Sequence, residues 1–251
     1  MPTTLIVLVH PEPDSFTAHW ARASAEASTA LGHDVLVSDL YAQGFDPAEG
    51  PVHYRTPGRF DALKAQEAAA KTGTLPADVA AEVEKVRAAD RLIFHFPLWW
   101  FAPPAMLKGW FDRALAHHAL HDVDRRFDTG PCRGKRALFC VTTGSRATES
   151  GPDGKEGDTR LLLWPAAYTL RYTGMTVLDP LLVHGVHGYN RDDRKAALDA
   201  RLAATLDAQA GLIARFDSLP EMAFNADTDF DETGRLKPGA PSVTPFIRRT
   251  D

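Results

Sequence analysis

The feature that most constrains the fold is a stretch near the middle of the chain, where a buried strand, an aromatic turn and an amphipathic helix follow one another. Residues 91–96 form a short apolar run that ends at Pro97, which predicts a strand buried on both faces. Pro103 and Pro104 suit the first turn of a helix. Apolar residues then recur at helical spacing over 106–115. This succession favours a parallel sheet, in which ligands bind at the turns that follow the strands.

The turn itself carries three adjacent aromatic side chains, Trp99, Trp100 and Phe101, directly after Leu98. Such a turn can pack against a partner subunit. It can also stack on a flat cofactor ring and keep water away from it. The residues of the turn leave both interpretations open.

Two other predicted strands end in residues suited to ligand binding. Residues 5–9 form an aliphatic strand that stops at His10, and a helix is expected to begin at Ser15 or Thr17 and to end near Leu31. This turn has no GxGxxG motif, but hydroxyls at a helix N-terminus, with His10 beside them, can bind a phosphate.

A further buried strand is expected over 135–142, and the TTGS sequence that follows it, Thr142 to Ser145, offers hydroxyl donors around a flexible Gly144. These groups suit a ring edge or a phosphate. Cys140, within the strand, is expected to act as a small core side chain.

The remaining elements complete an alternating pattern of strands and helices. A strand is expected over 34–38, and another over 175–183 that Pro180 interrupts, so that it lies at an edge or has a bulge. Pro165 is expected to kink a helix or to mark its restart, and Asn190 or Asp192 to cap a last long helix. That last helix is expected to end near 216. The other expected segments are a long connection over 42–59, helices over 60–71 and 78–89, and an irregular extension over 217–251 packed on the domain or on a dimer partner.

The overall composition excludes several classes of partner. The 251 residues carry a formal net charge of −5, which argues against nucleic acid or an anionic membrane surface as the main partner. No apolar run is long enough for a membrane span or a signal peptide. The two cysteines have neither CxxC nor metal-ligand spacing, so we expect a reducing, cytoplasmic environment. His117 and His121 have the i, i+4 spacing that chelates a metal on one helix face, but no acidic or cysteine partner is spaced to complete a site, so no metal is expected.

Taken together, these motifs resemble those of the FAD-dependent NAD(P)H:quinone oxidoreductase family, the DT-diaphorase group. The matching segments, in order from the first strand to about Phe216, are HPEPDSF, FPLWWFAPPAMLKGWFDR, TTGS, and GD followed by LLLWP. The alternating pattern without GxGxxG and the resemblance both imply an α/β fold of the flavodoxin-like, doubly wound type. Its five-stranded parallel sheet has the order 2-1-3-4-5 and helices on both faces. The flavin-binding domain would span 1–216.

The resemblance further implies a homodimer with one tightly bound FAD per subunit, each site built at the interface, and NAD(P)H as co-substrate. It implies four sets of contacts with the FAD. Residues at the first turn would hold the FAD pyrophosphate, the aromatic turn would line the isoalloxazine, the TTGS residues would contact its polar edge, and Arg194 would meet the adenylate side. The residues of the first turn are His10, Ser15, Phe16 and Thr17. Those of the aromatic turn are Pro97, Leu98, Trp99, Trp100 and Phe101, and those at the polar edge are Thr142, Thr143, Gly144 and Ser145. The family has Asn at position 17 and Gly at position 145.

The expected reaction transfers a hydride from NAD(P)H through flavin N5 to a quinone or a similar electrophile, in a ping-pong sequence. Many relatives assist with a Tyr and a His in the loop before GD. Those positions here are Ser150 and Glu156, so both assisting groups are absent. Glu156 is the candidate replacement, against the simpler interpretation of an exposed loop carboxylate. His184 and His187 are further candidates.

Other functions fit the same motifs. Azo and nitro compounds are alternative acceptors, and relatives with this fold serve as flavin-binding regulatory subunits of potassium-efflux systems. A one-electron FMN carrier is a third alternative, but such carriers are usually shorter and more acidic. The motifs favour the NAD(P)H dehydrogenase, while the nucleotide preference and the physiological acceptor stay open.

Overall fold

A computed structural model describes residues 1–55 and 58–249, so positions 56–57 of the expected connection and 250–251 of the expected extension lie outside the described residues. Its centre is a parallel sheet with the order β2-β1-β3-β4-β5, and β6 also pairs with β4. The predicted doubly wound fold and strand order are therefore confirmed. The strands are β1 (Thr3–Leu8), β2 (Asp34–Asp39), β3 (Arg91–Pro97), β4 (Arg136–Thr142), β5 (Thr176–Val177) and β6 (Leu181–Val183).

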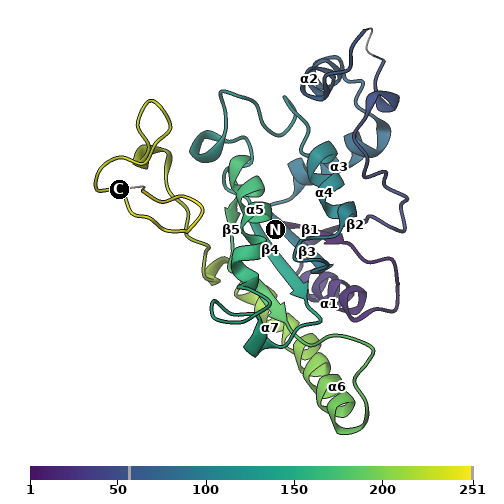
Figure 1. Cartoon of the computed structure of the whole chain (residues 1–251). Coiled ribbons are helices and arrows are strands. Elements are labelled where there is room, and N and C mark those ends of the chain that lie inside the picture. The colour runs from purple at the N-terminus through teal and green to yellow at the C-terminus, as the bar shows by residue number, and fades with distance from the viewer. Residues whose placement is uncertain (56–57, 250–251) are drawn as a thin grey trace.

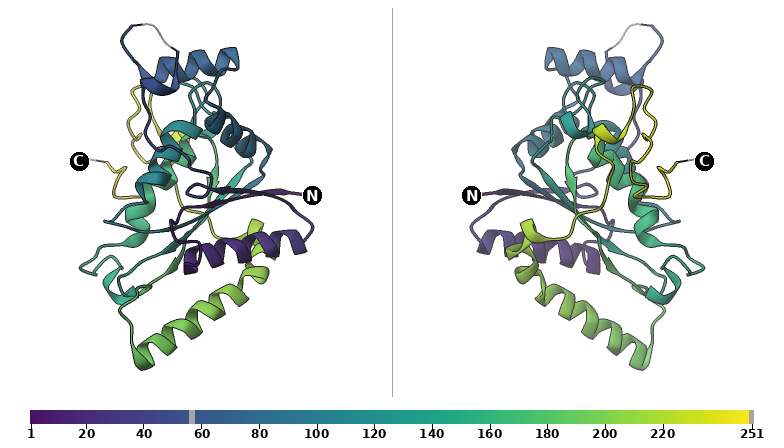
Figure 2. Two further views of the ribbon diagram at one scale, coloured as in Figure 1. Left: turned by 90° about the vertical axis from the view of Figure 1, so that its right-hand side faces the viewer. Right: turned by 90° about the vertical axis from the view of Figure 1, so that its left-hand side faces the viewer.

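Helices cover both faces of the sheet (Figures 1 and 2). One layer contains α1, α6 and α7, and the other contains α3, α4 and α5. The short α2 lies beyond the second layer, at the top of Figure 1. The helices are α1 (Phe16–Ala30), α2 (Ala62–Thr72), α3 (Ala77–Ala88), α4 (Ala105–Ala114), α5 (Thr159–Tyr172), α6 (Asp192–Asp207) and α7 (Gln209–Ala214).

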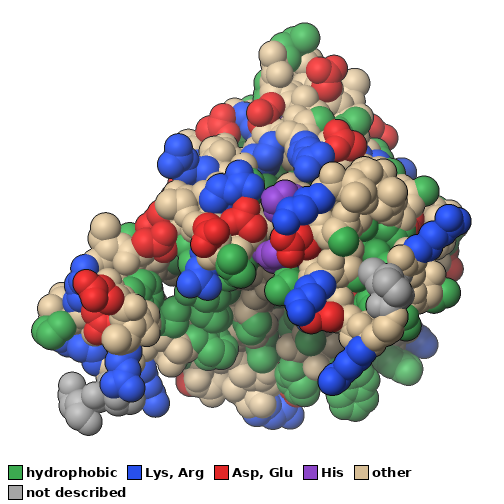
Figure 3. Space-filling view, turned by 90° about the horizontal axis from the view of Figure 1, so that it is seen from above, with side chains coloured by type: hydrophobic (Ala, Val, Ile, Leu, Met, Phe, Trp, Pro, Cys, Tyr) green, Lys and Arg blue, Asp and Glu red, His purple; other side chains and the backbone are tan. Residues whose placement is uncertain are grey.

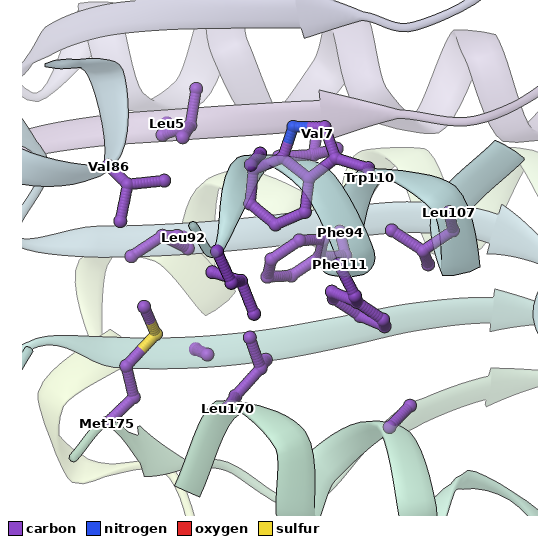
Figure 4. Close-up of a cluster of buried hydrophobic side chains, with 14 of the residues drawn as sticks. Leu5, Val7, Val86, Leu92, Phe94, Leu107, Trp110, Phe111, Leu170 and Met175 are labelled. Carbon is purple, nitrogen blue, oxygen red and sulfur yellow. The ribbon is translucent and has the colours of Figure 1, made fainter. Parts of the chain in front are cut away.

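The alternation of side chains along each strand divides the core in two. Leu5 and Phe94 point toward α3, α4 and α5, whereas their neighbours Ile6 and Ile93 pack against α1 and α7. Figure 4 shows Phe94 next to Trp110 and Phe111 of α4, and the ring centroids of Phe94 and Trp110 are 5.6 Å apart. Because both faces are covered, the central strands are mostly apolar, as is typical of parallel strands.

The strand expected over 175–183 is divided into two short strands. On β4, Ala137 and Cys140 are separated by three positions, while their partners Val177 and Leu181 are separated by four. One extra residue therefore forms a bulge next to Pro180, which cannot donate to the ladder. The extension pairs with this segment, since Leu178 and Glu221 form an antiparallel bridge, so the edge is partly covered.

Two helix predictions need correction. The last helix is two helices, because α6 ends at Asp207 and α7 begins at Gln209. Neither Asn190 nor Asp192 caps it: the N-cap is Arg191, without a side-chain hydrogen bond. Helix α5 neither ends nor restarts at Pro165, since it is continuous from Thr159 to Tyr172. Among the described residues, no helix has both the length and the apolar character needed to cross a bilayer.

His117 and His121 do not lie on a helix face, because α4 ends at Ala114. The two residues form an isolated bridge in the following loop, and their ring centroids are 5.2 Å apart. Within residues 1–55 and 58–249, no three His, Cys, Asp or Glu side chains gather into a metal-binding group.

The residues after α7 pack along α5. Phe246 stacks on Trp164 with ring centroids 4.6 Å apart, and Trp164 in turn stacks on Tyr168 at 4.3 Å. In the view from the α2 end, hydrophobic side chains gather in the hollow between this extension and the body of the molecule (Figure 3). The extension contains only short 3₁₀ turns and isolated bridges in its described part, as its irregular sequence predicts.

Candidate functional site

The turns that follow β1, β3 and β4 meet at the carboxyl edge of the sheet. The imidazole of His10, after β1, lies edge-on to the Trp99 indole, after β3, with ring centroids 6.0 Å apart. The Leu98 N–H donates to the Thr142 carbonyl at 2.8 Å. The hydroxyls of Thr17 and Thr142 are 3.3 Å apart. Since β1 and β3 flank the point where strand order reverses, the three turns occupy the usual ligand position of this architecture.

The aromatic turn has an unusual backbone. Trp99 and Ala102 exchange two backbone hydrogen bonds, of 3.0 and 3.1 Å, which closes the turn with Trp100 and Phe101 at its tip. These two residues have positive φ angles of 49° and 63°, a conformation that bulky side chains rarely adopt. The Trp100 side chain is 93% exposed and that of Phe101 is 52% exposed. Strained backbone and exposed large aromatics at one position indicate a binding function.

A cavity of about 270 Å³ lies beside this turn. It brings together predicted residues of the aromatic turn, the TTGS segment and the loop before α5. Two lining residues, Thr159 and Leu162, were not predicted, because helical periodicity does not say which part of α5 borders a cavity. The lining residues are Leu98, Trp100, Phe101, Thr143, Gly144, Ser145, Glu156, Thr159 and Leu162.

The predicted residues of the first turn lie at the N-terminus of α1. Ser15 is the N-cap, and its hydroxyl accepts from the Ala18 N–H at 3.2 Å, whereas Thr17 lies inside the helix. His10 Nδ1 accepts from the Glu12 N–H at 3.0 Å. Phe16 packs on Trp20, with ring centroids 5.6 Å apart. Thr17 is buried and bonded to Thr142, so its hydroxyl faces the sheet edge.

The predicted Arg194 borders a separate cavity of about 660 Å³ next to α6. Arg146 and Arg201 line the same cavity, so three guanidinium groups surround it. Sequence inspection identified only Arg194, since Arg146 and Arg201 are far apart in the chain and carry no motif. The guanidinium groups make this cavity suitable for an anionic group such as a phosphate.

The two positions that depart from the family pattern have different surroundings. Ser150 is buried, and its hydroxyl donates to the Arg146 carbonyl at 2.9 Å and lies 2.7 Å from the Ser145 hydroxyl. Glu156 is half-buried, and it borders the cavity beside the aromatic turn. Its side chain is therefore not simply an exposed loop carboxylate.

His184 and His187, the other histidines named above, both line the cavity next to α6. His184 Nδ1 lies 2.9 Å from the Thr143 hydroxyl, and Thr143 borders the other cavity. Burial, and then the positive charge of Arg201, lower the pKa of His184. This imidazole is therefore neutral at neutral pH.

This architecture, with ligand-binding turns at the carboxyl edge of a doubly wound parallel sheet, defines a class of nucleotide- and flavin-binding α/β proteins. Residues 2–208 match the family described as having a flavodoxin-like fold. The chain belongs to this family.

The chain is also similar in sequence and structure to particular members of this group. The chain is 37% identical over 199 residues to mouse ribosyldihydronicotinamide dehydrogenase [quinone], a match that covers 77% of this chain and 86% of the relative. It is 36% identical over 200 residues to rat NAD(P)H dehydrogenase [quinone] 1, covering 78% and 73% of the two chains. A putative quinone reductase from Klebsiella pneumoniae has a similar structure, with a TM-score of 0.84, 30% identity and 96% coverage of both chains. The resemblance found in the sequence motifs is thereby confirmed.

Proposed function

We propose that this protein is a flavin-dependent NAD(P)H dehydrogenase that reduces quinones. The observation that carries the proposal is the exposed aromatic turn at Trp100 and Phe101, held with positive φ angles beside a cavity between the turns that follow β3 and β4. The similarity to NAD(P)H and ribosyldihydronicotinamide quinone dehydrogenases supports the same activity.

The residues present suit a bound flavin. Exposed aromatic rings at Trp100 and Phe101 offer flat surfaces for stacking on a tricyclic ring and for excluding water from it. Hydroxyl and backbone groups at Thr143 and Ser145 offer hydrogen bonds to its polar edge. When bound, the flavin would supply the hydride chemistry, accepting from NAD(P)H and donating to the quinone. The protein's part is to orient both substrates in turn over the same cavity.

We infer further that the flavin is FAD rather than FMN. The N-terminus of α1, next to His10 and Ser15, suits a pyrophosphate. The arginine-lined cavity at Arg194 would give the adenylate half of a dinucleotide a cationic contact. FMN has a single phosphate and would leave one of these two positions unused.

We also propose that two copies of the chain form the working enzyme, with each flavin near the interface. The exposed fractions of Trp99, Trp100 and Phe101 are 42%, 93% and 52%. Such a cluster of large apolar side chains rarely faces water alone. We propose that the chain divides into a domain at 1–216 and an extension at 217–251. We also propose a reducing, cytoplasmic location, which the two buried, free cysteines support.

The test begins with the colour of the purified protein. We expect it to be yellow and to release FAD on denaturation, identified by chromatography against FMN. NADH or NADPH should bleach the bound flavin anaerobically, and a quinone should restore its absorbance. A flavin-containing protein that no quinone reoxidises would overturn the dehydrogenase and favour a regulatory subunit. Light scattering at several concentrations tests the dimer.

A further inference from the structure

Four side chains form a line of hydrogen bonds behind the cavity at the aromatic turn. His184 Nδ1 lies 2.9 Å from Thr143 Oγ1, and the Ser145 hydroxyl donates to Thr143 Oγ1 at 3.3 Å. Ser145 Oγ is also 2.7 Å from Ser150 Oγ. Ser150 also donates to the Arg146 carbonyl at 2.9 Å, which holds its oxygen beside Ser145.

This line joins the two cavities of the site. Thr143 and Ser145 border the cavity of about 270 Å³ beside the aromatic turn. His184, at the other end, borders the cavity of about 660 Å³ next to α6. Each intermediate link is a hydroxyl, a group that can accept one proton while it donates another. The arrangement therefore connects a surface cavity to the proposed substrate position.

The proposed reaction needs such a connection. Reduction of a quinone to a hydroquinone adds one hydride and one proton, and NAD(P)H supplies only the hydride. The proton must come from water, yet the cavity at the aromatic turn is where stacked rings exclude water. The Tyr and His that assist many relatives are replaced here by Ser150 and Glu156.

On the basis of the proposed function, we propose that His184, Thr143 and Ser145 carry a proton from water in the cavity next to α6 to the oxygen of the bound quinone. Ser145 touches the substrate, and Thr143 and His184 act through it. The Ser145 hydroxyl turns its proton from Thr143 Oγ1 toward the quinone oxygen and gives it up. The Thr143 hydroxyl, which donates to the Ser145 carbonyl at 3.2 Å, turns in the same way and gives its proton to Ser145 Oγ. The proton on His184 Nδ1 then passes to Thr143 Oγ1. Water replaces the lost proton at His184 Nε2. One proton moves from water to the quinone, and no electrons move along the path.

The charges around His184 keep it in the form that the path needs. Arg201 of α6 donates to the His184 backbone carbonyl, and Arg146 and Arg194 line the same cavity, together with His187. Burial and the positive charge of Arg201 both oppose a positive imidazole at His184. The neutral ring can accept at one nitrogen while it gives up a proton at the other, so it transmits protons without storing charge.

The first experiment needs no flavin. Nitrogen-15 NMR of the flavin-free protein identifies which ring nitrogen of His184 carries the proton. We expect the Nδ1–H form in the wild type and in Thr143→Ser, and a shift toward the Nε2–H form in Thr143→Val, which has the same shape but no hydroxyl. A His184 tautomer that is the same in all three proteins would overturn the path.

The second experiment measures the two half-reactions separately in the flavin-loaded protein by stopped flow. Thr143→Val and His184→Gln should slow reoxidation by a quinone about 100-fold, the lower range for loss of a positioned acid, and should slow reduction by NAD(P)H far less. Thr143→Ser should retain most of the wild-type rate. The solvent deuterium isotope effect on reoxidation should be present in the wild type.

The outcomes separate the two proposals. If the wild type binds flavin and reduces quinones but Thr143→Val reoxidises as fast as Thr143→Ser, the proton path is wrong and the proposed function stands. If the wild type reduces no quinone, the proposed function fails, whatever the NMR result. Flavin content per chain, measured for every variant, shows whether a slow rate reflects lost cofactor.

Discussion

The indole N–H of Trp110 donates a hydrogen bond of 2.8 Å to the buried carboxylate of Glu82, which joins α4 to α3. The same carboxylate accepts from the Ser38 hydroxyl at 2.7 Å and from Lys85 at 2.7 Å. One acidic side chain thus fixes β2, α3 and α4 relative to one another. The helix α4 that it holds follows directly from the aromatic turn, so the position of the turn depends on this contact.

Replacing Glu82 by alanine should therefore destabilise the fold. The change leaves the Trp110 indole N–H and the proton of the Ser38 hydroxyl buried without an acceptor, and we expect a loss of roughly 3 kcal/mol in the free energy of unfolding. Urea denaturation measures it. The matched control is Glu84→Ala on the same helix, whose exposed pair with Arg87 contributes less than about 1 kcal/mol. Equal losses in both variants would contradict the role of Glu82.

A glycine in α4 should be equally intolerant of change. A Cβ at Gly109 would lie 2.2 Å from the Pro47 carbonyl oxygen, so Gly109→Ala must displace the loop before α2. We expect a destabilisation of about 1–3 kcal/mol, as for other overpacked sites. Gly211→Ala in α7 is the control, because no heavy atom lies within 4 Å of its added Cβ. That variant should be neutral or slightly more stable, since alanine favours helices. Thermal and urea unfolding compare the two.

Stability should fall in mild acid because of a buried histidine. His95 of β3 is fully buried, and Ser24 lies 2.9 Å from its Nε2. Burial lowers the pKa of His95 from 6.5 to about 3. The unfolded chain binds a proton below about pH 6.5 that the native protein does not, so this group lowers the free energy of unfolding by about 1.4 kcal/mol per pH unit between those values.

The test compares the wild type with His95→Gln by urea unfolding from pH 7.5 to 4.5. The wild type should lose stability more steeply below pH 6.5, and the difference between the two proteins isolates the contribution of His95 from that of the carboxyl groups. His118→Gln, which changes an exposed histidine, should keep the wild-type slope. A parallel pH profile for His95→Gln would show that the buried imidazole does not control this transition.

Trp100→Ala should weaken flavin binding without affecting the fold. The side chain is 93% exposed and contributes little to packing, whereas loss of one stacked aromatic ring costs about 1 kcal/mol, or several-fold in affinity. Flavin dissociation constants from fluorescence quenching, with urea unfolding of the flavin-free proteins, measure both effects. Val52→Ala, which removes an exposed apolar group from a distant turn, should change neither. Unaltered affinity in Trp100→Ala would place the ring elsewhere.

The cysteines should be unreactive in the native state. Burial raises the pKa of the Cys140 thiol well above its ordinary value, and it raises that of Cys132 as well. Because the thiolate is the reactive form, we expect no reaction with a colorimetric disulfide reagent at pH 8 in the folded protein. Both thiols should react once urea unfolds the chain. If the native protein rapidly released the coloured product of the reagent, these side chains would be accessible.

Much of the fold is predictable because the apolar strands repeat a simple physical pattern. A parallel strand with helices on both faces must be apolar throughout, so 5–9, 91–96 and 135–142 could be recognised from composition alone. Predictions at the two prolines had different outcomes. Pro165 does not end α5, which is continuous from Thr159 to Tyr172, whereas Pro180 coincides with the expected bulge at the sheet edge.

The candidate site was partly predictable for a similar reason. Turns that follow parallel strands share one edge, so His10, Trp99 and Thr142 could be expected to meet, and they do. The residues that sequence inspection missed, such as Arg201 and Leu162, lie on helices whose pattern shows that one face is buried but not what that face borders.

The sequence by itself determined the central strands, the aromatic turn and the hydroxyl-rich turns, because these follow from local residue patterns and the chemistry of strand ends. Only the tertiary structure decided which distant side chains meet: Thr143 with His184, Ser145 with Ser150, and Glu82 with Trp110. Hydrogen bonds between residues far apart in the chain depend on how helices settle on the sheet. That packing is a property of the whole fold, and no local pattern encodes it.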